Sequence, residues 1–516
     1  MSFFQGIKNL VHLTRAMGSA DFGSAARGST YQGAGRGRTL RNWRAPSTGP
    51  NEPLLFDADN LRDRSRDMSR NDPWGAAMAE RRVTNMVGTG IKPRSEAPEE
   101  EHRAAIQDLW KRWTDEADAD GILDFYGLQE LATREWNDAG ECFGRFRFRR
   151  PEDGLTVPLQ LQLIESEQVP HNYNTVSPAN NPIRAGIERD MLGRRVGYWM
   201  YREHPGERFN MRANSGEIIR VPGDEVFHMF QPMRAGQLRG YPTITPVLAK
   251  MYQMGQFDDA TIMRQWVATL FAGFMKRPTA KAGAINPLTG KPRDEEQDWD
   301  ETDIASLESG TIQELPPGWE MEWADPPEAG STYEGFMRYQ LMSSAAAVGM
   351  SYEVLTGDLR GINDRLLRAL LQEFRRRVRM WQHHLLVHQF CRVVWSRWMD
   401  TAVLAGALQL PDYENRRAEY QSVRWVPERW PYLHPVQDVQ AEVDEIRAGL
   451  STRSERVNER GEDIESLDQE YKADQDRADR LGIMYSTDVR LTSSAGVAQD
   501  QNRDVDDNNG NGRPND

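Results

Sequence analysis

The first candidates for chemistry are three histidines on one predicted helix. His384 and His388 stand four residues apart, a spacing that places two imidazoles on one face of an α-helix, and His383 lies beside them. The HExxH pattern of zinc proteases is absent, because the three residues between the two histidines are apolar and supply no carboxylate. An ordinary helical surface or a subunit contact is therefore the favoured interpretation of this cluster.

A run of acidic residues is the second candidate. Residues 294–303 read DEEQDWDETD, and carboxylates of this kind can bind a divalent cation. The run lies in a stretch rich in proline and glycine, where adjacent carboxylates are usually solvated. A metal-dependent nuclease, or another enzyme that uses these side chains, is therefore kept as an alternative function.

Other catalytic patterns are missing from the sequence. No segment matches the P-loop, and GAGRGR near Gly33 does not lie between a predicted strand and a helix. There is no GxSxG or CxxC motif, and Cys142 and Cys391 are too few for a disulfide framework, which indicates a reducing compartment. The sequence therefore predicts no catalytic residue, no cofactor and no metal, and it favours a structural or interaction protein over an enzyme.

Length and composition narrow the class further. The chain has 516 residues, of which 38% are hydrophobic, so it can form folded cores and wholesale disorder is excluded. No apolar run approaches the roughly 18 residues that a membrane-spanning helix needs, so no membrane is expected as a partner. The net charge of −14 argues against a protein that coats DNA, but not against one that lets DNA pass by.

The charge is unevenly distributed along the chain. The first 50 residues contain seven Lys or Arg and one acid, which predicts a flexible basic arm. Residues 431–516 contain twenty acidic and ten basic side chains, and their last part has the composition of a disordered tail. Both ends are interpreted as solubilising tails; in a sharper hypothesis, the basic arm contacts an acidic partner or nucleic acid.

Hydrophobic periodicity predicts an α+β chain that is mainly helical. Helices are expected at 53–70, 73–87, from 98 onward, at 125–137, 243–275 and 332–348, from 365 onward, and in several short charged segments after 436. Alternating residues predict strands at 142–150 and 158–166, on either side of Leu192, and at 217–222, 225–230, 312–315 and 319–323. The fifteen tryptophans fit core packing one by one, but together they favour oligomerisation.

The helix after residue 364 combines an apolar seam with many arginines. Its apolar residues recur at heptad spacing, at Leu367, Leu371, Phe374, Val378, Trp381 and Leu385. Six arginines and only two acids lie between residues 364 and 380. Helices that pack against copies of themselves need charged flanks beside an apolar seam, so inter-subunit contacts are predicted for Arg375, Arg376, Arg377 and Arg379.

The order of these parts resembles the lambda-type family of tailed-phage portal proteins. The segments that carry the resemblance are DRSRDMSRNDPWGAAMAERRVTNMVGTGIKPR at 63–94, LRGYPTITPVL at 238–248, VGMSYEVLTGDLRGINDRLLRALLQEFRR at 348–376 and the stretch 430–467. The resemblance divides the chain into a basic arm (1–52), wing (53–242), stem helix (243–275), clip (276–330), second stem helix (331–348), tunnel loop (349–364), long helix and wing (365–430), crown (431–490) and disordered tail (491–516).

The resemblance implies a structural ring of about twelve copies at one capsid vertex. Double-stranded DNA would pass through its channel during packaging and ejection, bound weakly and without sequence preference. The implied partners are other copies of the chain, the terminase large subunit, the head–tail adaptor, and the major capsid protein or scaffold. The implied location is the virion, and the host cytoplasm during assembly. A scaffold or head-completion protein is the third hypothesis, which the inserted clip disfavours.

The resemblance also assigns roles to residues of two loops. A DNA-facing role is implied for the tunnel-loop residues Asp358, Arg360, Asn363, Asp364 and Arg365. Docking of the motor and then the adaptor is implied for the clip residues Lys276, Arg277, Lys291, Arg293, Asp294, Glu295 and Glu296. Arg360 stands between two acids and is expected to be partly neutralised by them, and pairing with a neighbouring subunit is its alternative role.

Overall fold

The computed structural model describes most of the chain. The described residues are Asn42, 45–207, 216–270, 274–276, 320–322, 333–431, 434–460, 464–483 and Tyr485. The chain divides into two units, 1–53 and 54–516, and nearly all described residues belong to the second, to which the following account is confined. The predicted tail 491–516 and nearly all of the predicted basic arm lie outside the described residues.

Four helices form where the sequence predicts them. They are α2 (Glu52–Asn71), α3 (Pro73–Val87), α4 (Glu100–Thr114) and α5 (Phe125–Ala139). Asp72 caps α3 by accepting a hydrogen bond from the Gly75 backbone N–H at 2.7 Å, and Pro73 occupies the first helical position. Gly88 ends the same helix with φ of 57°.

The alternating segments form two antiparallel sheets. The three-stranded sheet has the order β3-β2-β9, with β2 at Glu141–Phe148, β3 at Leu159–Ile164 and β9 at Val226–Phe230. The five-stranded sheet consists of β4 (Thr175–Val176), β5 (Pro182–Arg184), β6 (Ile187–Arg189), β7 (Arg195–Tyr201) and β8 (Ile218–Pro222). The turn predicted at Leu192 joins β6 to β7, which confirms that hairpin.

A third pairing joins distant parts of the chain. Strand β1 (Lys92–Ser95) pairs with β12 (Val423–Val426), more than 300 residues later. The sequence analysis missed β1, because Lys-Pro-Arg-Ser has no alternating apolar pattern. Short 3-10 helices follow three of the strands: Pro151–Asp153 after β2, Ser166–Gln168 after β3 and Gly223–Glu225 after β8.

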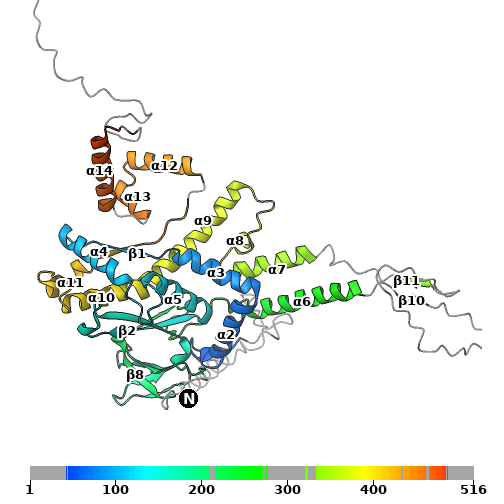
Figure 1. The fold of residues 1–516 in the computed structure, drawn as a ribbon. Helices are drawn as coiled ribbons and strands as arrows, with labels where there is room; N and C mark the ends of the chain where they lie inside the picture. Colours follow the sequence, from blue (N-terminus) through cyan, green and yellow to red (C-terminus); the bar gives the residue numbers. More distant parts are fainter. Residues whose placement is uncertain are drawn as a thin grey trace, which may run out of the picture. The chain divides into compact units, whose positions relative to one another are not determined.

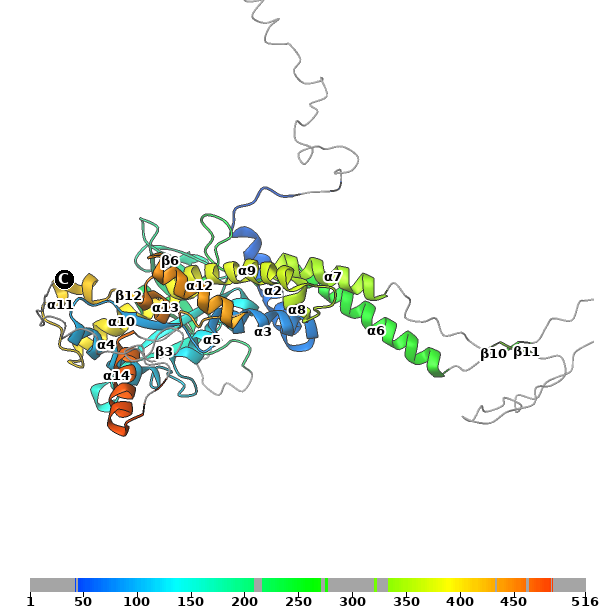
Figure 2. The same cartoon turned by 90° about the horizontal axis from the view of Figure 1, so that it is seen from above.

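The two predicted stem helices lie side by side. They are α6 (Leu248–Leu270) and α7 (Tyr333–Val348), and both views show them adjacent (Figure 1 and Figure 2). The Tyr333 hydroxyl bonds the Asp258 carboxylate, and the Lys250 ammonium bonds the Ser343 hydroxyl, so side chains connect the two helices at two positions.

The first stem helix is shorter than predicted. It was expected at 243–275, but it begins at Leu248 because Pro246 disfavours helical geometry in the residue before it. At its far end, Phe274–Lys276 forms strand β10, which pairs with β11 (Glu320–Glu322). Strand β11 falls inside the predicted strand 319–323, whereas the predicted strand 312–315 lies outside the described residues.

The long helix has three parts. Helix α9 (Asp364–Trp381) continues into a π-helical segment (Gln382–Cys391) and then into α10 (Arg392–Leu404). Phe374, Val378 and Trp381 are buried, as the heptad seam predicts, whereas Leu367 and Leu371 are only half-buried. The remaining helices are α8 (Tyr352–Thr356), α11 (Tyr413–Tyr420), α12 (Pro435–Arg447), α13 (Arg453–Glu459) and α14 (Ile464–Leu481).

Tryptophans form much of the main core. The Trp110 ring centroid lies 4.9 Å from those of Trp113, Trp395 and Trp398, and all four side chains are buried. These aromatic contacts join α4 to α10. Core packing therefore accounts for these tryptophans, and Trp266 on α6, 58% exposed, is the kind of tryptophan that an interface would use.

A buried carboxylate connects the two sheets. Glu141, the first residue of β2, is fully buried and accepts bonds from the Arg239 guanidinium at 2.6–2.9 Å and from the Gly240 N–H at 2.8 Å. Arg239 in turn donates to the carbonyl of Ala185, between β5 and β6, at 2.8 Å. Arg239 holds the pKa of Glu141 well below its usual range although burial opposes this. The two sheets are therefore connected by an ion pair that sequence periodicity does not reveal.

His228 completes this network as a neutral imidazole. Its Nε2 lies 3.0 Å from Glu141 Oε2 and its Nδ1 lies 2.8 Å from Arg195 Nη1, so Nε2 donates and Nδ1 accepts. Burial lowers the pKa of His228 to about 4 and also lowers that of His171. Both side chains therefore resist protonation in the folded protein.

We predict that acid weakens the network around Glu141 and so lowers the stability of the protein. Because the folded-state pKa of His228 is below the unfolded value of about 6.5, its contribution is complete above pH 6.5 and is lost as pH falls toward 4, at up to about 1.4 kcal/mol per pH unit. Urea unfolding between pH 8 and 4.5 measures this slope. His228→Gln should reduce the slope relative to the native protein, whereas the exposed-site control His384→Gln should leave it unchanged; equal slopes for both variants would contradict the assignment.

Candidate functional site

Glycines shape the loop that follows α7. Gly349, Gly357 and Gly361 all have positive φ, at 82°, 74° and 77°, a region that favours glycine. The short helix α8 lies between the first two, and the Ser351 hydroxyl caps it by accepting from the Val354 N–H. The predicted tunnel loop 349–364 thus contains a helical turn, and its glycines serve to reverse the chain.

Arg360 makes a compact ion cluster in this loop. Its guanidinium donates to both carboxylate oxygens of Asp358 at 2.8 and 2.9 Å and lies 2.8 Å from Glu334 of α7. The hydrogen bonds from Arg360 hold the pKa of Asp358 well below its usual range. One of the two acids predicted to flank Arg360 therefore contacts it. The expectation for Asp364 is wrong, because that carboxylate lies 3.5 Å from Arg368 and 3.0 Å from His434.

The other loop residues have local roles in the structure. Asn363 caps α9, its side-chain oxygen accepting from the Leu366 N–H at 2.9 Å. Arg365 is exposed in the first turn of α9. The structure thus brings the five predicted tunnel-loop residues into one short segment. Their contact with DNA stays a prediction.

The predicted clip site is largely outside the described residues. Lys276 is in β10, where it stands opposite Glu320 of β11. The other six positions are not described: Arg277, Lys291, Arg293, Asp294, Glu295 and Glu296. The acidic run 294–303 of the nuclease alternative falls in the same region.

The arginines predicted to contact a neighbouring subunit divide into two pairs. The guanidinium carbons of Arg375 and Arg379 lie 5.3 and 5.6 Å from the Trp430 ring centroid, so this pair makes cation–π contacts within its own chain. Arg376 and Arg377 are exposed and line a pocket beside α9. The inter-subunit role remains a prediction, and the second pair is better placed for it.

The predicted histidine cluster does not assemble into a ligand set. His383, His384 and His388 are all exposed on the π-helical segment. Within the described ranges, the group with metal-like spacing is instead Glu165, Glu167 and His204. Two arginines of α2 contact these glutamates: Arg62 lies 2.8 Å from Glu167 and Arg66 lies 3.7 Å from Glu165. These positive charges already balance the carboxylates, as in a structural ion-pair network.

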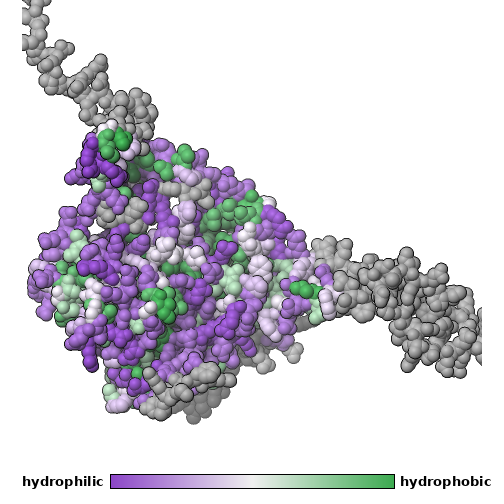
Figure 3. Space-filling view, viewed as in Figure 1, coloured by the Kyte–Doolittle hydropathy of each residue, from purple (hydrophilic) through white to green (hydrophobic). Residues whose placement is uncertain are grey.

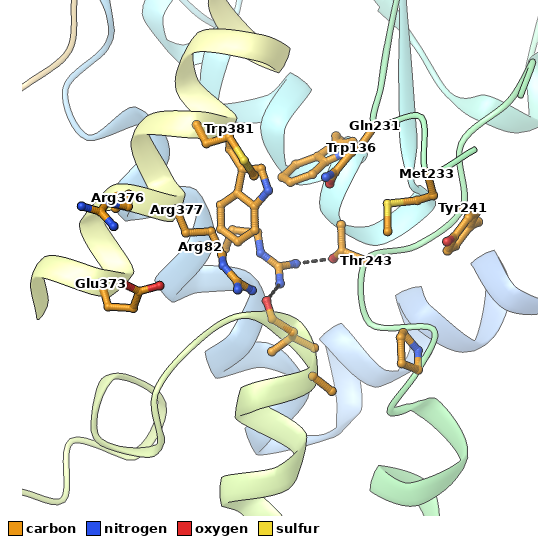
Figure 4. Close-up of a pocket in the computed structure, with 14 residues that line it drawn as sticks. Arg82, Trp136, Gln231, Met233, Tyr241, Thr243, Glu373, Arg376, Arg377 and Trp381 are labelled. Carbon is orange, nitrogen blue, oxygen red and sulfur yellow. Dashed lines mark hydrogen bonds between the residues drawn. The ribbon is translucent and has the colours of Figure 1, made fainter. Parts of the chain in front are cut away.

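A buried arginine connects the predicted wing to the predicted stem. Arg82 of α3 is 1% exposed, and its Nη2 donates to the carbonyl of Val348, the last residue of α7, at 2.8 Å (Figure 4). Its Nη1 donates to the side-chain oxygens of Asn137 and Thr243, from α5 and the segment before α6. Four separate parts of the chain therefore meet at one guanidinium.

Aromatic rings enclose the same guanidinium. The Arg82 guanidinium carbon lies 5.2 Å from the Trp381 ring centroid and 5.9 Å from that of Trp136. Burial lowers the pKa of Arg82 to about 10, the nearby Asp138 opposes this shift, and Arg377 adds to it. The sequence gives no signal for this role, because an arginine beside Arg81 on an amphipathic helix looks like a surface side chain.

None of the helices in the described ranges combines the length and the apolar character needed to cross a membrane.

The family match and the similar sequences are all phage portal proteins. Residues 36–382 match the family described as phage portal protein, lambda family. The chain is similar to a probable portal protein of Halomonas phage phiHAP-1, at 25% identity over 496 residues and 93% of each chain. It is 22% identical to the portal protein of Escherichia phage N15 and to portal protein B of Escherichia phage lambda, over 84% of this chain and 87% of each relative.

A solved structure gives a weaker likeness. The chain is similar to one in the neck of a native gene transfer agent particle with C12 symmetry, at 13% identity and a TM-score of 0.42. That likeness covers 81% of this chain and 95% of the other.

We predict that Arg82→Met destabilises the protein by about 3 kcal/mol, because it leaves the buried acceptors of Val348, Asn137 and Thr243 without their donor. Urea unfolding followed by tryptophan fluorescence measures the change, since Trp136 and Trp381 adjoin the site. Arg81→Met is the matched control: this side chain is adjacent and exposed, so its effect should stay within about 0.5 kcal/mol. Equal urea midpoints of unfolding for the two variants would show that the hydrogen bonds of Arg82 do not stabilise the contact between these elements.

Proposed function

This chain belongs to the lambda family of phage portal proteins, and from that membership we propose that about twelve copies form a ring at one capsid vertex. The observation that carries the proposal is the extent of the family match, which spans the predicted wing, stem, tunnel loop and start of the long helix. The ring would form the channel through which DNA is packaged and later ejected. The protein would thus act as a structural component of the virion.

The exposed surface of the stem supports assembly into a ring. Large apolar side chains on α6 and α7 are 41–69% exposed: Tyr252, Phe257, Ile262, Met263, Trp266, Phe336, Tyr339 and Met342. A soluble monomer rarely leaves so many apolar side chains on two adjacent helices in water. Neighbouring copies of the same two helices are the simplest cover for them.

Charge supports a channel that does not grip DNA. Counterion release makes each Lys or Arg contact with a phosphate favourable, so a basic lining repeated in every copy would hold DNA tightly. The chain instead carries a net charge of −14, and two carboxylates neutralise Arg360. A mainly repulsive lining with few positive contacts suits DNA that must keep moving.

The partners of the ring follow from the same proposal. The terminase large subunit and then the head–tail adaptor would dock at the clip, 276–330, and the major capsid protein or scaffold would surround the wing. Assembly would begin in the host cytoplasm. Family membership favours this function over a metal-dependent nuclease and over a scaffold or head-completion protein.

We predict a large, closed particle for the purified protein. Twelve chains of 59.0 kDa give a mass of about 710 kDa, and negative-stain electron microscopy should show a ring with a central hole. Mass photometry at moderate salt gives the copy number directly. A protein that stays monomeric or dimeric at high concentration would count heavily against the proposal.

We predict that Arg360→Ala leaves ring assembly intact and alters DNA packaging or retention, because Arg360 is 70% exposed and its ion partners lie within its own chain. Packaged DNA length and particle yield are the measurements. Glu334→Gln is an informative partner variant, since it frees Arg360 from α7 without removing the positive charge, and it should change packaging in a different manner from Arg360→Ala. Unchanged DNA length and yield in both variants would remove this cluster from the functional residues.

A further inference from the structure

A pocket beside Arg82 carries more positive charge than its own chain neutralises. Its cavity of about 400 Å³ lies between α3, α7, α9 and the segment before α6, and Arg82, Arg376 and Arg377 line it (Figure 4). The other walls are largely apolar and include Trp136, Trp381, Met233 and Met380. The pocket therefore combines a cationic side with an aromatic and aliphatic side.

The three guanidiniums have no carboxylate partner among the described residues. Arg82 donates only to uncharged groups, and its Nε is buried without a hydrogen bond in the part of the chain that the structure describes. In the same described part, Arg376 and Arg377 make no ion pair. Glu373 also lines the pocket, but it forms no ion pair with either arginine within the described ranges. The positive charge at this site is thus open to an outside anion.

Burial makes an unbalanced charge costly, and a counter-ion reduces that cost. Arg82 is buried and Arg377 lies close to it, so these two positive charges repel each other more strongly than they would in water. A carboxylate meets the planar, forked guanidinium with two parallel hydrogen bonds, which is the strongest common pairing for arginine. The site is therefore prepared for an oxyanion.

We propose that this pocket receives an Asp or Glu side chain from the neighbouring copy of this chain in the ring. The inference rests on the proposed function, because it needs a neighbour. The apolar walls favour an anion on an aliphatic stem over a bare phosphate, since methylene groups can cover Trp381 and Met380 while the carboxylate meets Arg377. The chain itself supplies candidates, because acidic residues outnumber basic ones by 78 to 64.

The surface of α9 on the side of the preceding loop has the composition of an interface. On the face drawn in Figure 3, hydrophilic side chains predominate, and apolar ones gather over α9 and the loop before it. Leu359 in that loop and Leu366 in the first turn of α9 are 51% and 49% exposed. Leu367 and Leu371 of the heptad seam are only half-buried. A charged anchor surrounded by apolar contacts is the usual arrangement of a protein–protein interface.

Such a contact would connect assembly to the loop. Arg377 packs directly against Gly349, where a Cβ atom would lie 1.9 Å from its Nη1, and Gly349 is the first residue of the loop. Arg82, on the other side, holds Val348. A carboxylate that binds Arg377 when the neighbouring subunit docks would therefore fix the position of Gly349, where the loop begins.

Charge reversal tests the proposal. Arg377→Glu should raise the protein concentration at which half of the chains are in rings at least tenfold, as measured by mass photometry across a dilution series. Arg112→Glu on α4, an exposed arginine outside the pocket, is the matched control and should assemble like the native protein. Thermal melting of the unassembled Arg377→Glu chain checks that the exposed substitution leaves the subunit folded.

Photocrosslinking identifies the occupant. Benzoylphenylalanine in place of Met380 should crosslink to an acidic peptide of a second chain, as mapped by mass spectrometry. Crosslinks confined to the same chain, or native-like assembly of Arg377→Glu, would overturn the proposal. It would also fail if inorganic phosphate raised the melting temperature of the native protein but not of Arg377→Ala while both assembled equally, since the pocket would then hold a free anion. A native protein that forms no ring would instead refute the proposed function itself.

Discussion

The placement of one buried guanidinium determines how α3, α7, α9 and the segment before α6 meet. Arg82 reaches from α3 to the last carbonyl of α7, to Thr243 before α6, and lies over Trp381 at the end of α9. Each of these groups is far from the others in sequence, so packing alone would leave their relative positions loosely specified. Directional hydrogen bonds in a dry site fix those positions, because a buried polar group that loses its partner is costly.

At the two sheets a buried carboxylate, Glu141, plays the part that the Arg82 guanidinium plays among the helices. Glu141 collects bonds from Arg239, His228 and Gly240, and through Arg239 it connects the two sheets. The two networks are close along the chain: Asn137, near the end of α5, bonds Arg82, and Glu141, the first residue of β2, follows four residues later. The short connection between them is tight, because a Cβ on Gly140 would lie 1.9 Å from the Tyr241 carbonyl carbon. The segment Asn137–Glu141 thus connects the Arg82 contacts directly to the Glu141 network.

This arrangement bears on how a ring could handle DNA. The arginines of the loop and of α9 are numerous, but most have intramolecular partners: carboxylates for Arg360 and Arg368, and the Trp430 ring for Arg375 and Arg379. Most of these guanidiniums are therefore already held by contacts within their own chain. A net acidic chain in which most of these arginines already have intramolecular contacts fits a conduit, because free arginines in every copy would bind the phosphate backbone.

Local patterns in the sequence determined the elements. Periods of 3.6 and 2 residues placed the helices and strands, Asp72-Pro73 fixed the start of α3, and the order of the parts indicated the family, because these signals depend on neighbouring residues alone. The tertiary structure decided which polar residues matter. Arg82, Glu141 and Glu334 look like ordinary surface residues until folding buries or pairs them, and one of the two partners of Arg360, Glu334, lies 26 residues away on α7. Strand β1 likewise exists only because β12 lies beside it. Contacts between distant residues depend on how whole elements pack, and hydrophobic periodicity, which reflects only neighbouring residues, does not predict them.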